Sequence, residues 1–533
     1  MIVSDTEHRF ELSRRKLLIA AGMTAAASFA GGAGAEAAAP VARQPQPVSG
    51  PPVHGLHLQF GADAASEMVV SWHTLEPVRR PRVVLGRLDG TLERKIDAVE
   101  TNYKDAKSGQ TVYAYHARLV GLQPGSAYMY AAMHDGTEPE FGTFRTLARG
   151  RVPFTFTSFG DQGTPTLGKR YVPPAGVTLA NPPFVNDNLG GPAGADTTLG
   201  VERLRPAFHL FNGDLCYANI AEDRVRTWWD FWSNNSRSAR NRPWMPSPGN
   251  HENELGNGPI GYRAYQTYFS LPPAAGQTDV TRGLWYAFTA GSMRVISIAN
   301  DDIVYQDAGN SYVRGYSNGA QKAWLEKELA KARGDRSIDW IVICMHQVAI
   351  SSVDKFNGAD LGIRQEWLPL FDKYAVDLVV CGHEHHYERS HPIRGQQANA
   401  TLTPIPAATA TDVIDTTKGT VHMIIGGGGT SLPSNTLFFD PPGCRVITAV
   451  APAPDPATGK RPAVYVHEDA PWSAVRNAAH AYGFAAFTLD PGSKPGGYTT
   501  IAVTYYDVVG SGGEIAPFET FTLRRPRRDG GKA

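Results

Sequence analysis

The sequence predicts two domains of different fold class, an N-terminal β-sandwich followed by a larger α/β domain. The chain has 533 residues, more than one hydrophobic core usually serves. Short β-branched and aromatic runs separated by turns occupy residues 53–148, which is typical of a sandwich. From residue 149 to 523, apolar strands alternate with helical patterns, and this alternation indicates an α/β layer architecture.

Composition excludes several function classes. The 51 basic residues balance the 51 acidic ones, so no global field favours nucleic acid or an anionic membrane. The four cysteines are scattered without a C-x-x-C pair, which argues against a zinc ribbon or a disulfide scaffold. Cys344 and Cys381 lie in apolar runs and are expected to be buried free thiols. An export signal would still allow a disulfide.

The first 39 residues predict such a signal. Arg14 and Arg15 precede an Ala-rich apolar segment over 19–30, and small residues at 33–39 offer cleavage sites. This order resembles a bacterial twin-arginine (Tat) signal and implies an exported protein, periplasmic or secreted. A Sec signal and a membrane anchor are the alternatives, but the segment is shorter and richer in Gly and Ala than a span of about 20 residues. The Pro- and Gln-rich residues 40–52 indicate a linker.

Residues 53–148 contain no catalytic cluster. Strands are expected at 68–72, 111–117, 128–130 and 141–146. Trp72, the Leu-x-Pro-Gly-x-x-Tyr-x-Tyr pattern and the closing Phe-x-Thr resemble fibronectin type III domains. A packing or positioning role follows, with carbohydrate or protein binding as the alternative.

The larger domain has strands that end abruptly in polar turns. Strands are expected at 153–159, 207–212, 244–248, 338–345, 377–381 and 421–425, and again within 481–533. Helices are expected at 321–332, with Asn318 as the N-cap, and at 365–374. Residues 164–200 and 430–480 are predicted to be long loops at the rim of a site. The basic residues 524–533 are predicted to form an exposed tail.

Candidate ligands follow five of these strands. They are Asp161, Asp214 with Tyr217, Asn250 with His251, His346, and His383 with His385. A single Gly-Asp turn is ordinary turn chemistry, and a histidine-rich loop is compatible with polar surface. The whole set has too many donors for one ion, but enough for two ions that share a carboxylate. In extended chain, His383 and His385 would face the same side, which by itself suggests one metal.

The ordered series resembles the five sequence blocks of the purple acid phosphatases, which are binuclear metallophosphoesterases. The blocks are Gly160-Asp161-Gln162-Gly163, Gly213-Asp214-x-x-Tyr217, Gly249-Asn250-His251-Glu252, His346, and Gly382-His383-x-His385. The resemblance implies a metallophosphoesterase-type α/β sandwich. It also implies that Asp161, Tyr217 and His385 hold Fe3+, that Asn250, His346 and His383 hold a divalent ion (Fe2+, Zn2+ or Mn2+), and that Asp214 bridges them.

The same resemblance implies an acid phosphatase that hydrolyses phosphomonoesters, and the N-terminal signal implies that it is exported. A metal-bound hydroxide would be the nucleophile, and His251 would be the general acid. A purely orienting role toward Asn250 is the alternative for His251. The expected partner is a small-molecule phosphoester, with no nucleic acid and no membrane span in the mature chain. Nothing in the sequence indicates an oligomeric state.

The sequence departs from plant-type members in one segment. These members carry further substrate-contacting histidines after the position of His346, whereas residues 351–360 contain none. Lys355, Asn357 and Asp360 are the residues available there. Substrate preference therefore stays open, and a phosphodiesterase on the same site is the alternative. A surface binding protein that has lost activity is a third reading, against which the complete set of ligand positions argues.

Overall fold

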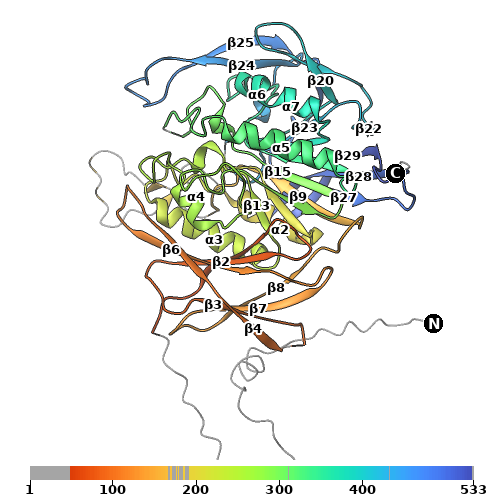
Figure 1. Cartoon of the computed structure of the whole chain (residues 1–533). Coiled ribbons are helices and arrows are strands. Elements are labelled where there is room, and N and C mark those ends of the chain that lie inside the picture. Colours follow the sequence, from red (N-terminus) through yellow and green to blue (C-terminus); the bar gives the residue numbers. More distant parts are fainter. Residues whose placement is uncertain are drawn as a thin grey trace, which may run out of the picture.

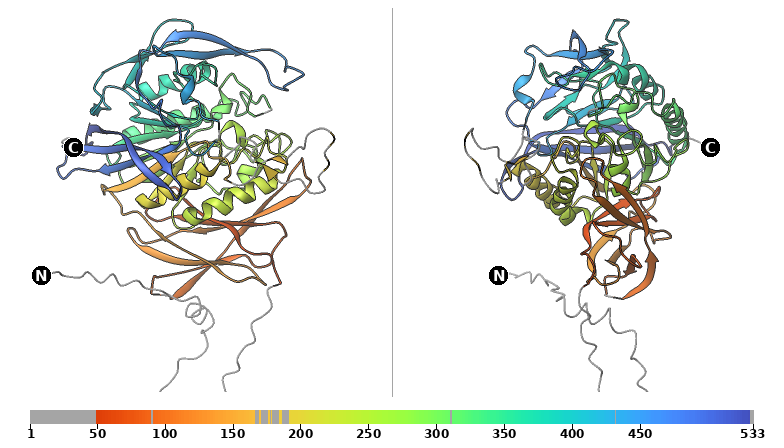
Figure 2. Two further views of the ribbon diagram at one scale, coloured as in Figure 1. Left: turned by 180° about the vertical axis from the view of Figure 1, so that it is seen from behind. Right: turned by 90° about the vertical axis from the view of Figure 1, so that its left-hand side faces the viewer.

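The structure is a computed structural model that describes residues 49–530 except Gly90, Asn310, Ser431 and most of 166–190. The predicted export signal and most of the predicted linker lie outside the described residues. A β-sandwich forms one end of the molecule, and a larger α/β body forms the rest (Figures 1 and 2). Within the described part of the chain, no helix has the length and apolar character needed to cross a membrane.

The N-terminal sandwich consists of two four-stranded antiparallel sheets. The first has the order β1 (His54–Phe60), β2 (Met68–Thr74), β6 (Thr111–Leu119) and β5 (Val99–Lys104). The second has the order β4 (Leu92–Asp97), β3 (Arg82–Gly86), β7 (Ala127–Met133) and β8 (Glu140–Arg145). Trp72 is fully buried and packs 5.6 Å, between ring centroids, from Tyr115. The predicted sandwich is confirmed.

Two seven-stranded sheets form the larger body. The first has the order β13 (Trp244–Pro246), β12 (Phe208–Phe211), β9 (Phe154–Phe159), β27 (Gly483–Asp490), β28 (Tyr498–Gly510), β29 (Glu514–Pro526) and β22 (Val413–Asp415). The second has the order β14 (Tyr286–Ala290), β15 (Met293–Ser297), β16 (Trp340–Cys344), β18 (Leu378–Cys381), β23 (Val421–Ile425), β19 (Tyr387–Ser390) and β26 (Ser473–Arg476). Strands β9, β12 and β13 are parallel, as are β15, β16, β18 and β23.

Shorter elements surround these sheets. A small sheet joins β17 (Ala359–Asp360), β24 (Gly443–Val450) and β25 (Ala463–Asp469), and two strand pairs join β10 (Lys169–Arg170) with β11 (Phe184–Val185) and β20 (Ile393–Gln396) with β21 (Pro404–Pro406). The α-helices are α2 (Pro192–Leu204), α3 (Arg224–Ala239), α4 (Arg263–Tyr268), α5 (Ala320–Gly334), α6 (Leu361–Glu366) and α7 (Leu368–Lys373). The described residues also form short 3-10 helices, η1 (Asn250–Glu252), η2 (Asn300–Asp302) and η3 (Asn435–Leu437).

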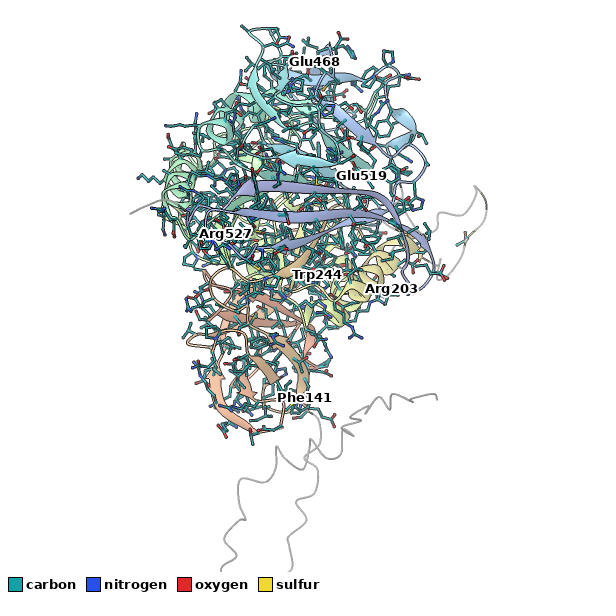
Figure 3. All side chains as sticks on the ribbon, turned by 90° about the vertical axis from the view of Figure 1, so that its right-hand side faces the viewer. Phe141, Arg203, Trp244, Glu468, Glu519 and Arg527 are labelled. Atoms are coloured by element: carbon teal, nitrogen blue, oxygen red, sulfur yellow. The ribbon has the colours of Figure 1, made fainter. Side chains whose placement is uncertain are left out.

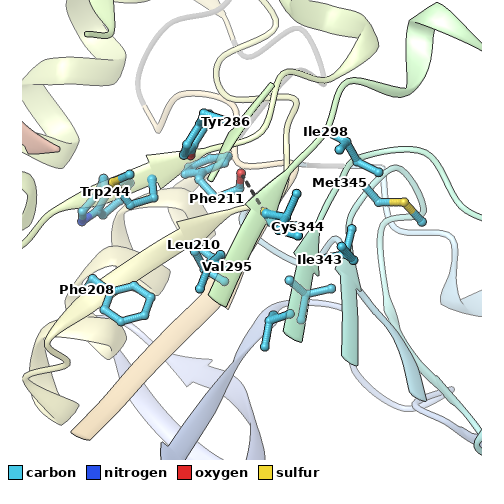
Figure 4. Packing of buried hydrophobic residues seen from close by; sticks show 14 of the residues in the cluster. Phe208, Leu210, Phe211, Trp244, Tyr286, Val295, Ile298, Ile343, Cys344 and Met345 are labelled. Atoms are coloured by element: carbon cyan, nitrogen blue, oxygen red, sulfur yellow. Dashed lines mark hydrogen bonds between the residues drawn. The ribbon is translucent and has the colours of Figure 1, made fainter. Parts of the chain in front are cut away.

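The two large sheets meet through an apolar core. Every residue of β12 and β16 is buried, as expected for parallel strands covered on both faces. Figure 4 shows this packing, with Phe211 and Trp244 from one sheet and Val295 and Ile343 from the other. The Cys344 thiol reaches across to the Phe211 carbonyl at 3.9 Å. All four cysteines are buried and free, which confirms the thiols predicted for Cys344 and Cys381.

Helix α3 connects the sandwich to the body. It lies between strand β1 and the first large sheet (Figure 1). Its Trp229 stacks on His54 with ring centroids 3.4 Å apart, and its Trp232 stacks on His57 at 3.8 Å. Aromatic faces of this size contribute most of the contact energy at such junctions, so the sandwich is firmly seated on the body.

Two helix predictions need correction. Helix α5 starts at Ala320 after Gly319, which adopts φ +79°, so the predicted cap Asn318 does not cap it. The Ser317 hydroxyl instead accepts the free Gln321 N–H at 3.3 Å. The helix predicted at 365–374 is divided into α6 and α7 near Trp367. Pro at the start of α7 cannot supply an N–H to continue the first helix.

The prediction of a long loop at 430–480 is also wrong, because these residues contain the β24–β25 hairpin. Alternating β-branched residues form its strands, and the Pro-rich stretch between them forms only its tip. The other predicted loop, 164–200, overlaps the start of α2 at Pro192, and most of it lies outside the described residues.

The C-terminal residues differ from the predicted exposed tail. Arg524 and Arg525 belong to β29, and Arg525 is buried against Asp377. Arg527 pairs with Asp529 and donates to the Gly492 carbonyl at 2.6 Å. Figure 3 labels Arg527 together with Glu519 on this C-terminal segment. The buried carboxylate of Asp377 holds Arg525, whereas Arg527 is held within its own segment by Asp529. The basic charge of the segment did not indicate these contacts.

Candidate metal centre

All eight predicted site residues follow the carboxyl ends of parallel strands. Asp161 follows β9, Asp214 and Tyr217 follow β12, Asn250 and His251 follow β13, His346 follows β16, and His383 and His385 follow β18. Such ends are where open α/β sheets build their sites. The two sheets deliver them to one place, since residues from the first sheet hydrogen-bond residues from the second.

The turns that carry these residues have unusual backbone. Asp161, Asp214, Tyr217 and His383 adopt φ of +60°, +52°, +60° and +71°. The left-handed region costs a non-glycine residue about 1–3 kcal/mol. Strained residues that gather at one spot are typical of functional sites. The glycines beside them have a steric reason, because a Cβ at Gly249 would collide with the Asp214 carboxylate.

Asp161, Tyr217 and His385 form a first group. The Tyr217 hydroxyl lies 3.2 Å from Asp161 Oδ1 and 3.0 Å from His385 Nε2. His385 Nε2 is also 3.3 Å from Asp161 Oδ1. Its other ring nitrogen, Nδ1, bonds the Leu432 carbonyl at 2.8 Å, so Nε2 is the atom that faces the group. Thr430 lies beside it, 3.2 Å from the Tyr217 hydroxyl.

Asn250, His346 and His383 form a second group. His346 Nε2 lies 3.1 Å from Asn250 Oδ1 and 3.2 Å from His383 Nδ1. His346 Nδ1 bonds the Asn212 carbonyl at 2.7 Å, which fixes the ring and directs Nε2 inward. The ligand atoms of Asp214, His346 and His383 all lie within 4.8 Å of one another.

Asp214 connects this second group to His251. Its Oδ2 lies 3.1 Å from His346 Nε2, and its Oδ1 accepts the His251 backbone N–H at 2.9 Å. Asp214 also acts on the first group, since its carboxylate helps to raise the pKa of Tyr217. Asp214 thus contacts the second group directly and acts electrostatically on the first.

The donor set fits cations. His346 Nε2 is within 3.2 Å of Asn250, Asp214 and His383 atoms at once, yet one ring nitrogen has only one N–H or one lone pair. Burial lowers the pKa of His346, but the Asp214 and Asp161 carboxylates outweigh it and raise this pKa to about 10. Burial, together with the same carboxylates, raises the pKa of the Tyr217 phenol well above 10. Converging acceptors of this kind are satisfied by metal ions.

His251 lies on the open side of the site. Its side chain is 16% exposed, whereas those of His346 and Asp161 are fully buried. Nδ1 lies 2.8 Å from the amide oxygen of Asn219, and Nε2 lies 4.0 Å from Asp214 Oδ2. Burial lowers the pKa of His251 to about 4, against the raising effect of Asp214. The His251 ring thus lies beside the two ligand groups but belongs to neither of them.

Four residues that the sequence reasoning did not single out support the site. Glu252 accepts the backbone N–H groups of Gly249, Asp214 and Leu215 at 2.7, 2.9 and 2.7 Å. Asn212 and Asn219 orient His346 and His251, as described above, and the Gln306 amide nitrogen lies 2.8 Å from His383 Nε2. Glu252 and Asn219 stand beside motif residues, a signal that was available. Gln306 has no local signal.

The segment 351–360 has mainly structural contacts. Asn357 donates to the His383 carbonyl at 2.8 Å, and buried Asp360 accepts the Gly362 and Tyr305 N–H groups at 2.8 and 2.9 Å. Of the three candidates named for substrate contact, only Lys355 is exposed. Phe356 packs against His385, with ring centroids 5.1 Å apart. This segment thus supports the His383–His385 turn.

Three further histidines lie near strand ends but outside the two ligand groups. His209 is buried, bonds Thr157 Oγ1 at 2.9 Å and packs against Phe159. His386 bonds Ser434 Oγ at 2.7 Å, and His422 is buried near Phe371.

Comparison with known proteins also divides the chain into an N-terminal sandwich and a larger catalytic-type domain. The family model for the purple acid phosphatase N-terminal domain matches residues 53–146, and that for calcineurin-like phosphoesterases matches residues 185–387. The chain belongs to the purple acid phosphatase family. Within the family, it is 59% identical over 477 residues to an uncharacterized protein of Mycobacterium tuberculosis, covering 90% of this chain and 88% of that protein.

More distant relatives are purple acid phosphatases. A purple acid phosphatase of Glycine max is 25% identical over 386 residues, covering 70% of this chain and 72% of that protein. The structure of a purple acid phosphatase from yellow lupin seeds aligns with a TM-score of 0.64 at 20% identity, covering 90% of this chain and 75% of that chain. At that identity the alignment shows the shared fold: a β-sandwich joined to a metallophosphoesterase domain.

Proposed function

We propose that this purple acid phosphatase family member is an exported acid phosphatase that hydrolyses phosphomonoesters. The observation that carries the proposal is the pair of ligand groups coupled to Asp214, one with a phenol and one with two imidazoles. Acid phosphatases among its relatives support the activity. The proposed domain bounds are 53–148 and 149–523, after a cleaved signal over 1–39 and a linker over 40–52, and strand β29 extends the second domain to Pro526.

The two groups would hold different ions. Asp161, Tyr217 and His385 would hold Fe3+, because phenolate and carboxylate are hard anionic donors. Asn250, His346 and His383, which have no anionic donor of their own, would hold Fe2+, Zn2+ or Mn2+. Asp214 would bridge the two. When bound, such a metal pair neutralises phosphate charge and makes a bound water acidic.

The residues of the chain would act around that pair. Glu252 holds the Asp214 and Asn250 turns in register through three N–H bonds. Asn219 Oδ1 accepts the Nδ1 proton of His251, so Nε2 is the atom that gains and releases a proton. We assign His251 as the general acid that protonates the leaving alkoxide. A phosphoester dianion beside the ring favours the imidazolium and so opposes the effect of burial on its pKa.

A substrate panel with metal analysis tests the proposal. The purified mature protein should contain iron, absorb visible light, and hydrolyse aryl phosphomonoesters faster than diesters at acidic pH. A colourless, iron-free protein that prefers diesters would instead establish the phosphodiesterase. A metal-loaded protein without activity on either class would establish a binding protein.

Export is tested separately. Expression with the native N-terminus in a Tat-competent bacterium should yield a processed protein outside the cytoplasm. Replacing Arg14 and Arg15 together by Lys should retain the precursor inside. Efficient export of that variant would refute the Tat assignment.

A further inference from the structure

The β24–β25 hairpin extends along the edge of the molecule beyond the second large sheet (Figure 1). Strand β24 pairs with β17, so the hairpin is attached next to the segment 351–360 that supports His383. Its strands leave residues 451–462 as the tip. This tip carries two consecutive basic residues, Lys460 and Arg461.

Arg461 fixes the tip close to the metal centre. Its backbone N–H donates to Asp307 Oδ2 at 2.8 Å, and its guanidinium donates to Asp307 Oδ1 at 3.2 Å. The same guanidinium lies 4.6 Å above the Tyr312 ring. The Asp307 side chain is only 4% exposed, so this pair is better shielded than a surface ion pair. Asp307 directly follows Gln306, whose amide nitrogen lies 2.8 Å from His383 Nε2.

Lys460 directly precedes Arg461 in the chain, so the bonds between Arg461 and Asp307 also hold Lys460 near Gln306 and His383, at the rim of the metal centre. The Lys460 side chain is exposed, and no ion pair involving it occurs among the described residues. The hairpin tip thus presents a cation that has no ion-pair partner among the described residues, next to the segment that contacts His383.

We propose that Lys460 is a substrate-binding residue whose ammonium group contacts the anionic oxygens of the phosphoester. A lysine ammonium is a point charge on a flexible stem, suited to a phosphate that approaches from solvent. Lys460 would supply charge and hydrogen bonds from outside the histidine-free segment 351–360. The inference rests on the proposed function, because it names a contact to that reaction's substrate.

Steady-state kinetics on the metal-loaded enzyme test this contact with four variants. Lys460→Ala should raise KM for an aryl phosphomonoester and Ki for orthophosphate, each by about tenfold, as expected for the loss of one charge-assisted bond. Lys460→Arg should recover most of the loss. Asp307→Asn, which leaves the lysine but weakens the attachment of the tip, should show a smaller rise. Lys494→Ala removes an exposed lysine from the β27–β28 turn and should behave as wild type.

Two outcomes separate this inference from the proposed function. If wild type hydrolyses monoesters and Lys460→Ala matches Lys494→Ala in KM and Ki, the contact is refuted and the phosphatase assignment stands. If metal-loaded wild type has no activity, the phosphatase assignment fails. Calorimetric titration with orthophosphate then decides the contact alone, since an equal Kd for wild type and Lys460→Ala would overturn it.

Discussion

The imidazoles of His383 and His385, two residues apart in the chain, contact different groups. His383 Nδ1 lies 3.2 Å from His346, whereas His385 Nε2 lies 3.0 Å from the Tyr217 hydroxyl. The positive φ of His383 ends the extended conformation directly after Gly382, so the rings do not share one side of a strand. One short turn therefore serves both ligand groups. This arrangement supports the assignment of the two histidines to different ions.

The first prediction concerns colour. Tyr217→Phe removes the hydroxyl that approaches Asp161, His385 and Thr430, and with it the only phenol in the ligand set. We expect the visible absorption of the iron-loaded protein to disappear. Absorbance spectra and elemental analysis check this. An unchanged visible band in an iron-containing variant would show that Tyr217 is not an iron ligand.

The second prediction concerns the proposed general acid. His251→Ala leaves both ligand groups in place, so the variant should keep its metal content. Turnover should fall by about 10²–10⁴-fold, the usual contribution of a general acid. Substrates with a good leaving group need less protonation, so they should be affected less than alkyl phosphates. An equal loss on both substrate types would favour the orienting role of His251 toward Asn250.

A third prediction concerns Glu252. In Glu252→Gln, one carboxylate oxygen becomes an NH2 group that must face at least one of the three N–H donors. One buried N–H then lacks an acceptor, which should lower the free energy of unfolding by about 1–3 kcal/mol. The variant should also lose metal more readily in chelator titrations, because the Asp214 turn is released. Glu93→Gln, on an exposed position of β4, is the matched control and should change neither quantity.

The fourth prediction concerns acid stability. Burial lowers the pKa of His57 from 6.5 to about 4 and that of His116 to about 3. Both rings lie where the sandwich meets the body, with His116 bonded to Ser71 and to the Thr267 carbonyl. Below pH 6.5 the unfolded chain binds protons that the folded chain does not. Stability should therefore fall as the pH decreases from 6.5 to 4, by about 1.4 kcal/mol per pH unit for each such histidine.

Urea unfolding between pH 7.5 and 4.5 measures this slope. His116→Gln removes one titrating ring and should reduce the slope by about 1.4 kcal/mol per pH unit, even if it lowers stability at every pH. His467→Gln, on the exposed side of β25, should leave the slope as it is. A slope that is the same in both variants would contradict the proposed linkage.

Sequence reasoning identified the strands that matter and the residues at their ends. Strand β16 and its neighbours are continuous apolar runs, and the turn glycines and polar residues follow them directly. Because this pattern involves only residues close together in the chain, it can be recognised in the sequence. The order of these turns is what resembles the family. The two domains and the free thiols Cys344 and Cys381 could be predicted for the same reason, since hydrophobic periodicity records burial.

The parts of the fold and of the site that the sequence did not predict depend on contacts between residues far apart in the chain. Glu252 clamps the Asp214 turn from 38 residues away, and Arg461 reaches Asp307 across 154 residues. The β24–β25 hairpin was not predicted, because its tip is rich in proline. The first residues of the predicted basic tail belong to β29, where Arg525 pairs with buried Asp377. The sequence by itself determined which donors exist and which strands present them. Only the tertiary structure decided how they divide into two groups, because side-chain direction depends on backbone angles such as the φ of His383, which packing selects.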